Sequence, residues 1–195
     1  MNIIVEGLDR SGKSTLINRL LKEFPHLKHV HFTVNDYGEN QPKNDVVLNP
    51  NIPIYGQIES YVKSVKDEME SPDRGFIFDR WVYTDRAIGE ILHGYKTKYT
   101  NLAQQLDLDS YLHKCKTVVI WCTLLDTEYH RKLLKEEGTN DVLLDNYDTA
   151  SFKYTKVMFD AANSLPLIRY DWKDGTLKLD DVIDLLVKYN KESVC

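Results

Sequence analysis

The sequence has few cysteines, no long apolar run and no surplus of basic residues, and each of these absences excludes a class of protein. The cysteines show no CxxC spacing, so we expect free thiols in a reducing compartment rather than a zinc site; they are Cys115, Cys122 and Cys195. No stretch approaches the ~18 consecutive apolar residues that a membrane helix needs. The formal net charge of -5 argues against a protein that coats nucleic acid, which usually carries a basic surplus.

The sequence also has few arginines, and its histidines are not clustered. Arginine occurs at only seven positions, so an arginine within a motif is informative. The six histidines show no metal-ligand spacing, and we interpret His29 and His31 as side chains that decorate a strand. The first residues, MNIIVE, lack a basic region ahead of a long apolar stretch, so we expect no signal peptide, a cytoplasmic location and no membrane partner.

The apolar residues that are present, 42% of the chain, follow two alternating patterns. Short apolar runs predict buried strands at residues 3–5, 29–32, 76–78, 117–122 and 165–170. Helical spacing predicts helices at residues 13–24, 54–69, 84–92, 102–112, 127–137, 151–162 and 179–189, whereas residues 35–53 are typical of a long polar loop. This alternation predicts an α/β fold, a parallel β-sheet of about five strands flanked by helices on both faces. We expect a single domain over residues 1–195.

A phosphate-binding loop lies between the first expected strand and the first expected helix. Residues 7–14 read GLDRSGKS and match the pattern GxxxxGK[ST] in full. Gly7 and Gly12 let the backbone turn its N–H groups toward a polyphosphate, and the following helix points its positive end there. Lys13 is expected to reach the β- and γ-phosphates of ATP, and the Ser14 hydroxyl is expected to ligate Mg²⁺. The residues expected around the ATP phosphates are Gly7, Arg10, Ser11, Gly12, Lys13, Ser14 and Thr15.

Other nucleotide-binding classes fit the sequence less well. A switch GTPase needs a guanine-reading NKxD after a later strand, and the nearest string, NKES at residues 190–193, lacks the aspartate. A large mechanical ATPase needs a longer chain. A small-molecule kinase is therefore favoured by elimination.

The acceptor site is predicted from Asp79 and Arg80, which directly follow the expected strand at residues 76–78. Ligands of an open parallel sheet gather beyond the carboxyl ends of its strands, so this pair is expected to face the phosphate-binding loop. Arg80 is suited to bind a phosphate bidentately and to neutralise charge during transfer. Asp79 is suited to order Mg²⁺ or its water shell. The alternative interpretation is an ion pair on the surface.

These motifs resemble the thymidylate kinase family. Residues 6–15, EGLDRSGKST, resemble the family's EGxDxxGKST, and residues 79–84, DRWVYT, resemble its DRYxxS. A weaker likeness links DNYD at residues 145–148, followed by Phe152, to an ERYE stretch of the family. The resemblance implies a P-loop kinase that transfers the γ-phosphate of Mg-ATP to a deoxynucleoside monophosphate, with a pyrimidine as the base.

The resemblance also implies roles for individual residues. Asp9 would contact the 3′-hydroxyl of the deoxyribose or the acceptor end of the loop, and Arg10 would reach the transferring phosphate. Arg80 would hold the acceptor phosphate, and Tyr147 would lie beside the sugar. The expected catalytic residues are Lys13, Arg10, Arg80 and Asp9.

A lid and a base-reading segment follow from the same resemblance. Residues 127–146 would close over ATP, with Arg131 and Lys135 on one helix face and Arg131 near the ATP phosphates. Tyr55 would stack on the base, and Gln57 would form hydrogen bonds with a pyrimidine edge.

The identity of the acceptor stays open, because residues 32–37 lack the family's arginine for the acceptor phosphate and Asn146 stands where another arginine is expected. A monophosphate needs no catalytic base, whereas an alcohol needs a nearby carboxylate. The candidate carboxylates are Glu6, Asp9, Asp36 and Asp79. The alternatives are a kinase that phosphorylates a hydroxyl of a deoxynucleoside or of a modified base in DNA, with nucleic acid as a partner in the latter case, and a non-catalytic NTP-binding regulatory module. The oligomeric state is also open and includes a homodimer.

Overall fold

The sheet of this protein is entirely parallel and has six strands in the order β3-β2-β4-β1-β5-β6. The computed structural model describes residues 1–94, 100–136, 138 and 141–192. The strands are β1 (Asn2–Glu6), β2 (Lys28–Thr33), β3 (Asp45–Val47), β4 (Phe76–Asp79), β5 (Thr117–Cys122) and β6 (Leu167–Tyr170). The predicted α/β class, with its parallel sheet, is therefore confirmed.

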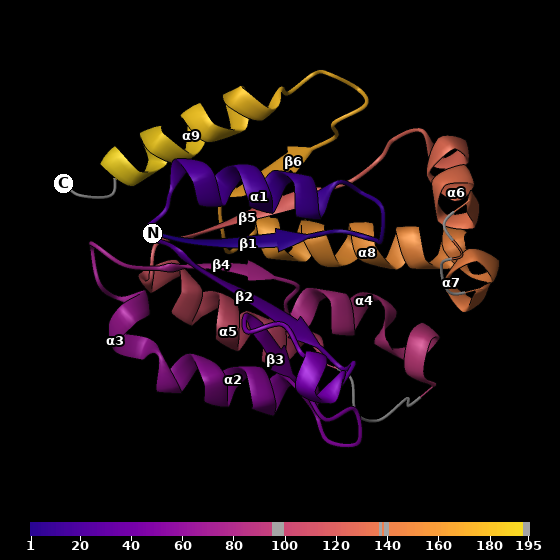
Figure 1. Cartoon of the computed structure of the whole chain (residues 1–195), viewed down its shortest axis with the longest axis horizontal. Helices are drawn as coiled ribbons and strands as arrows, with labels where there is room; N and C mark the ends of the chain where they lie inside the picture. The colour runs from indigo at the N-terminus through magenta and orange to yellow at the C-terminus, as the bar shows by residue number, and fades with distance from the viewer. Residues whose placement is uncertain (95–99, 137, 139–140, 193–195) are drawn as a thin grey trace.

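Helices cover both faces of the sheet (Figure 1). They are α1 (Lys13–Glu23), α2 (Ile54–Ser64), α3 (Lys66–Met69), α4 (Val82–His93), α5 (Leu102–Lys114), α6 (Thr127–Glu136), α7 (Asp141–Asp145), α8 (Tyr147–Ala162) and α9 (Leu179–Glu192). Helices α1 and α9 lie on one face, and α2, α4, α5 and α8 lie on the other. None of the described helices is long and apolar enough to cross a membrane.

Alternation along β1 shows how one strand supports two cores. Ile3 and Val5 pack into the core beneath α1 and α9, whereas Ile4 packs into the core shared with α2, α4, α5 and α8. All three side chains have no solvent exposure. A strand buried on both faces reads as a continuous apolar run, which is why the sequence revealed β1 and β5 clearly.

The structure adds detail where the sequence suggested only a loop. Residues 35–53 contain a short 3-10 helix, η1 (Gly38–Asn40), and the edge strand β3. β3 pairs with β2 in the register His31 with Asp45. A strand of three residues is too short to show a period of two, so only its partner strand identifies it.

Two helices also differ in extent from the predictions. The expected helix at residues 54–69 is interrupted at Val65, whose φ of -112° ends α2 before α3 begins. Helix α8 begins at Tyr147, four residues before the expected start. Cys115 and Cys122 are buried free thiols, while Cys195 and three residues of the expected lid (137, 139 and 140) lie outside the described residues.

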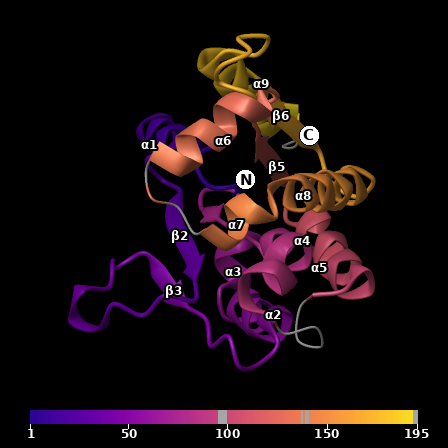
Figure 2. The same ribbon diagram turned by 90° about the vertical axis from the view of Figure 1, so that its right-hand side faces the viewer.

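Helices α6 and α7 lie beyond the carboxyl ends of the strands, as the two views show together (Figures 1 and 2). The loops that follow β1, β2 and β4 open toward the same end. This arrangement brings segments far apart in the sequence to one edge of the sheet, where ligands of open parallel sheets bind.

Candidate functional site

The turn between β1 and α1 has a backbone that only glycine tolerates at two positions. Gly7 has a φ of 146° and Gly12 a φ of 93°. A Cβ atom on Gly7 would lie 2.1 Å from the carbonyl oxygen of Cys122, and one on Gly12 would lie 2.6 Å from Cδ1 of Trp172. The glycines of the motif are therefore required by conformation and by close packing, as the spacing of the motif predicts.

Lys13 is buried at the centre of this turn. Its Nζ donates hydrogen bonds to the carbonyl oxygens of Gly7, at 3.0 Å, and Leu8, at 2.9 Å. Burial, together with the nearby positive charge of Arg80, lowers the pKa of Lys13 to about 8. An incoming phosphate would stabilise the charged form, because it supplies the negative charge that the two carbonyls lack.

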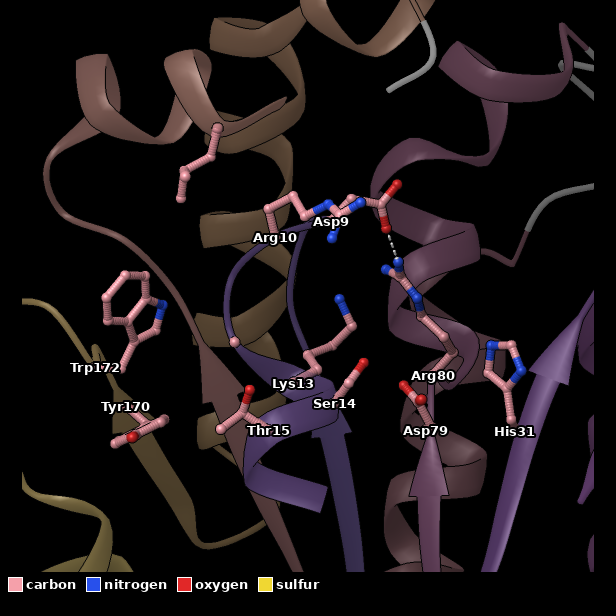
Figure 3. A pocket seen from close by; sticks show the side chains of 12 residues that line it. Asp9, Arg10, Lys13, Ser14, Thr15, His31, Asp79, Arg80, Tyr170 and Trp172 are labelled. Atoms are coloured by element: carbon pink, nitrogen blue, oxygen red, sulfur yellow. Dashed lines mark hydrogen bonds and ion pairs between the residues drawn. The ribbon is translucent and has the colours of Figure 1, made fainter. Parts of the chain in front are cut away.

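A cavity of about 880 Å³ opens beside the loop (Figure 3). We call it the P-loop cavity. The lining residues are Asp9, Arg10, Gly12, Lys13, Ser14, Thr15, His31, Asp79, Arg80, Leu133, Tyr170 and Trp172. The structure thus brings most of the expected phosphate-binding residues together in one cavity, with Asp79 and Arg80 beside them.

Ser14 and Asp79 fit the requirements of a magnesium site in this cavity. Oδ1 of Asp79 is buried and has no hydrogen-bond partner among the described residues, so one carboxylate oxygen is available to a cation. The described residues contain no cluster of three or more His, Cys, Asp or Glu side chains that could hold a metal by itself. Mg²⁺ is commonly held by one or two protein oxygens together with phosphate oxygens and water, and this donor set matches that description.

Asp9 and Arg80 form an ion pair at the mouth of the loop. The guanidinium of Arg80 also donates a hydrogen bond of 2.7 Å to the carbonyl oxygen of Gly7. Burial acts to raise the pKa of Asp9, but the charges of Arg80 and Lys13 outweigh it, and the pKa lies below its ordinary value. Asp9 is therefore ionised, and part of the charge of Arg80 is already neutralised.

A second cavity, of about 440 Å³, meets the first at three shared residues: Asp9, His31 and Arg80. Its other lining residues are Phe32, Thr33, Val34, Asn35, Leu48, Ile54, Ile58, Trp81, Thr84, Asp85, Ile88, Gly89 and Leu92. Most of these residues are apolar, and the polar ones are Thr33 and Asn35, at and after the end of β2, and Thr84 and Asp85 on α4. A mostly apolar cavity with a few polar groups suits a small organic molecule.

The two residues expected to read a base lie outside the second cavity. On α2, Ile54 and Ile58 face the cavity one turn apart, so the phase of the helix turns Tyr55 and Gln57 away from it. The side-chain amide of Gln57 is engaged with the backbone of Asn49, through hydrogen bonds of 2.8 and 2.9 Å. Gln57 thus fixes the loop before α2.

Arg131 of α6 and Tyr147 of α8 lie outside the P-loop cavity. Tyr147 is buried, and its hydroxyl is 2.8 Å from Nδ1 of His130. Burial raises the pKa of Tyr147 to about 12. The guanidinium of Arg131 lies 4.4 Å from the centre of the Tyr147 ring and pairs with Asp148. Both residues brace α6 against α8.

His130 of α6 forms a hydrogen bond with the backbone of the loop between β1 and α1, and the sequence did not single it out. Its Nε2 donates a hydrogen bond of 2.6 Å to the carbonyl oxygen of Asp9, since a carbonyl can only accept. Its spacing from Leu134, one turn later on the buried face of a charged helix, is the signal that could have indicated it.

Because His130 is buried, the stability that this contact between α6 and Asp9 provides depends on pH. Burial lowers the pKa of His130 below 6.5, although the hydrogen bond to Asp9 acts in the opposite direction. As the pH falls, His130 takes up a proton in the unfolded chain before it does so in the native protein. The stability that neutral His130 contributes is therefore complete above pH 6.5 and is lost as the pH falls through the native pKa of His130. We expect the melting temperature of the wild type to fall more steeply from about pH 7 to about pH 5 than that of His130→Gln, which does not titrate. Circular dichroism melts test this, and parallel pH curves for the two proteins would contradict it.

Glu6, which precedes the loop, is a buried carboxylate that organises the start of α4. It accepts hydrogen bonds from the backbone N–H of Trp81, at 2.7 Å, and from the hydroxyl of Thr84, at 2.7 Å. The Gly7 N–H, at 3.3 Å, and the Tyr154 hydroxyl also donate to it. Burial raises the pKa of Glu6 despite the nearby cations. With its oxygens engaged in this way, Glu6 supports the site and is not placed to act as a base.

Asp36 also lies away from the site. It is exposed in the loop after β2, and it lines neither the P-loop cavity nor the second cavity. Of the candidate carboxylates, only Asp9 and Asp79 line the P-loop cavity.

The fold is shared with solved P-loop kinases. The chain is similar to the YorR protein of Bacillus subtilis, solved in complex with phosphorylated GDP, with a TM-score of 0.65 and 19% identity over 98% of each chain. It is similar to thymidylate kinase from Candida albicans, with a TM-score of 0.51 and 16% identity over 98% of this chain and 91% of that one. A deoxyadenosine kinase from M. mycoides gives a TM-score of 0.50 and 15% identity over 100% of both chains. No protein-family model and no curated protein matches the chain.

Proposed function

We propose that the protein is an ATP-dependent phosphotransferase that moves the γ-phosphate of Mg-ATP to a nucleoside-type acceptor. The observation that carries the proposal is the meeting of the two cavities at Asp9, His31 and Arg80. One cavity is built around the loop that carries the phosphate-binding motif, and the other is mostly apolar and suits a small organic molecule. Two ligands that fill them would place their reacting ends together, and positioning supplies a large part of catalysis in phosphoryl transfer.

On the donor side, the residues expected from the motif would bind the phosphates and Mg²⁺ of the nucleotide and neutralise their charge. Lys13 would exchange its two carbonyl partners for the β- and γ-phosphates, and the guanidinium of Arg10 would approach the transferring group. Ser14 and Asp79 would hold Mg²⁺, which neutralises charge on the phosphates when bound. Arg80 would stabilise the negative charge that develops between donor and acceptor.

The family resemblance suggests a deoxynucleoside monophosphate with a pyrimidine base as the acceptor. Arg80 at the junction supports this acceptor, because a guanidinium binds phosphate bidentately. One similar structure is a thymidylate kinase by name and another is a deoxyadenosine kinase, so the fold serves both nucleotide and nucleoside acceptors. Under this proposal the protein would act in nucleotide biosynthesis in the cytoplasm.

A hydroxyl acceptor is the second candidate, and a specific observation favours it. Arg80 is already paired with Asp9, and the described residues that line the second cavity include no lysine and no other arginine. A dianionic acceptor phosphate would therefore meet one partly neutralised cation and the ionised Asp9. An alcohol on a deoxynucleoside, or on a modified base in DNA, carries no such charge.

An assay of ADP release tests the proposal. The acceptors are deoxynucleosides, deoxynucleoside monophosphates and single-stranded DNA that contains hydroxymethylated pyrimidines. We expect ADP to form only when Mg²⁺, ATP and one of these acceptors are all present. If no acceptor supports ADP release although ATP binds, the protein is a regulatory NTP-binding module and the proposal fails.

Trp172 offers a second test of the donor site. It is 41% exposed on the wall of the P-loop cavity, whereas Trp81 and Trp121 are 2% and 8% exposed. Stacking of a base on an aromatic side chain contributes ~1–3 kcal/mol, so Trp172→Ala is expected to raise KM for ATP roughly tenfold.

The matched control for this test is Trp172→Phe, which keeps an aromatic ring but removes the fluorophore. ATP should change the tryptophan emission of the wild type and leave that of Trp172→Phe unchanged, while KM for ATP stays near the wild-type value. An unaltered KM in Trp172→Ala would exclude stacking on this residue.

A further inference from the structure

The sequence suggested only that His31 decorates a strand, yet the structure puts it where the two cavities meet. It lies on β2 between Asp45 of β3 and Asp79 of β4, and it is in register with both. Figure 3 shows its imidazole beside Asp79 and Arg80 at the side of the pocket. It lines the P-loop cavity and the second cavity alike.

Asp45 fixes the orientation of this imidazole. Nδ1 of His31 lies 3.0 Å from Oδ1 of Asp45, whose side chain is 4% exposed. The other oxygen of Asp45 accepts a hydrogen bond from the side-chain amide of Gln41. An ionised carboxylate can only accept, so Nδ1 of His31 carries the proton. In this tautomer the ring presents the lone pair of Nε2 to the cavities.

Nε2 of His31 has no hydrogen-bond partner among residues 1–94, 100–136, 138 and 141–192. The side chain is 32% exposed at the junction of the cavities, so a ligand in the second cavity can reach it. A ring held by a carboxylate on one nitrogen and open on the other is a common arrangement for accepting a proton from a substrate.

We infer that Nε2 of His31 accepts the hydrogen bond of the acceptor's reacting hydroxyl, and that the acceptor is therefore an alcohol of a nucleoside-type compound. This inference rests on the proposed function and names its substrate class. A dianionic phosphate has no hydrogen to donate to a lone pair, whereas an alcohol has one and needs a base because of its high pKa. The missing arginine after β2 is consistent with an uncharged acceptor.

These groups account for every bond and proton in the phosphate transfer. The hydroxyl oxygen forms the bond to the γ-phosphorus, while the bond from that phosphorus to the β,γ-bridging oxygen breaks and ADP leaves. The hydroxyl proton passes to Nε2 of His31. Asp45 stabilises the imidazolium that results, so His31 is a catalytic residue and Asp45 is a positioning residue that acts through it.

Two measurements test this inference: product analysis identifies the bond that is formed, and variant kinetics show whether His31 assists the transfer. Phosphorus NMR of the product separates a phosphate ester on a hydroxyl from the phosphoanhydride that a monophosphate acceptor would give. Free deoxynucleosides and DNA with hydroxymethylated pyrimidines form separate arms, because both present an alcohol. We expect an ester from at least one arm.

His31→Ala is expected to lower kcat by about 10²-fold or more while KM for ATP changes little, and added imidazole should restore part of the rate. Asp45→Asn should lower kcat less, again without a change in KM for ATP. His31→Gln keeps the side-chain volume and serves if the alanine variant folds poorly, with ATP-dependent Trp172 emission as the check on the donor site. The matched control is His113→Ala, since His113 is exposed on α5 and should leave the rate unchanged.

The outcomes separate the two proposals. A phosphoanhydride product, full activity of both His31 variants or a failure of imidazole to restore any rate would overturn the role of His31 while phosphotransfer stands. No ADP from any acceptor would overturn the proposed function and this inference with it.

Discussion

Lys13→Met is expected to lower kcat/KM for phosphate transfer by on the order of 10³-fold. Lys13 is 8% exposed at the centre of the loop and lines the P-loop cavity. Its charge is already desolvated, so its interaction with phosphate oxygens is worth more than the same contact in water. Methionine has a similar volume and no charge, so the change removes the electrostatic contribution and little else. Steady-state kinetics with the best acceptor measures the effect.

The fold is expected to survive this substitution. Lys13 donates to two backbone carbonyls within its own loop, and replacing a desolvated charge by an apolar side chain of similar size often leaves stability unchanged. Lys22→Met on the exposed side of the same helix is the matched control and should keep wild-type activity. A Lys13→Met enzyme within tenfold of the wild type would show that the loop does not hold the donor phosphates.

Glu6→Ala is expected to lower the free energy of unfolding by roughly 4 kcal/mol. The carboxylate has no solvent exposure and accepts hydrogen bonds from Gly7, from Trp81 and Thr84 at the start of α4, and from Tyr154 of α8, so its removal leaves buried donors without a partner. Among these donors, the Trp81 N–H cannot turn toward another acceptor, whereas the Gly7 N–H also lies 3.1 Å from the Tyr154 hydroxyl oxygen. Urea denaturation followed by circular dichroism measures the loss.

Two further variants show whether the loss comes from the buried hydrogen bonds. Glu6→Gln keeps the volume and one accepting oxygen, so it should lose less stability than Glu6→Ala. Glu23→Ala removes a glutamate that is partly exposed on α1 and paired with Arg19, and it should change stability little. If Glu6→Ala and Glu23→Ala unfold at the same urea concentration, Glu6 does not organise α4.

The parts of the site that the sequence predicted are those encoded within a few residues. The loop from Gly7 to Ser14 needs two glycines with positive φ and a lysine at a fixed spacing, and such requirements appear as a motif. Arg80 was predicted because it directly follows a short apolar run, and strand ends in a parallel sheet share one edge.

The parts that the sequence missed depend on contacts between distant segments. His130 lies 121 residues from the Asp9 carbonyl that it binds, and nothing local to either residue indicates the pair. Tyr55 and Gln57 were chosen from the resemblance, and the phase of α2 places Ile54 and Ile58 toward the second cavity instead.

The sequence by itself determined the alternation of strands and helices, the glycine-dependent turn after β1 and the position of Asp79 and Arg80 at a strand end, because hydrophobic period and backbone sterics act over short stretches of chain. Only the tertiary structure decided that β3 pairs with β2, which sets Asp45 beside His31. It also decided that two cavities share one junction. The pairing of strands and the packing of helices depend on contacts between segments far apart in the chain, and their geometry appears only once the sheet is assembled.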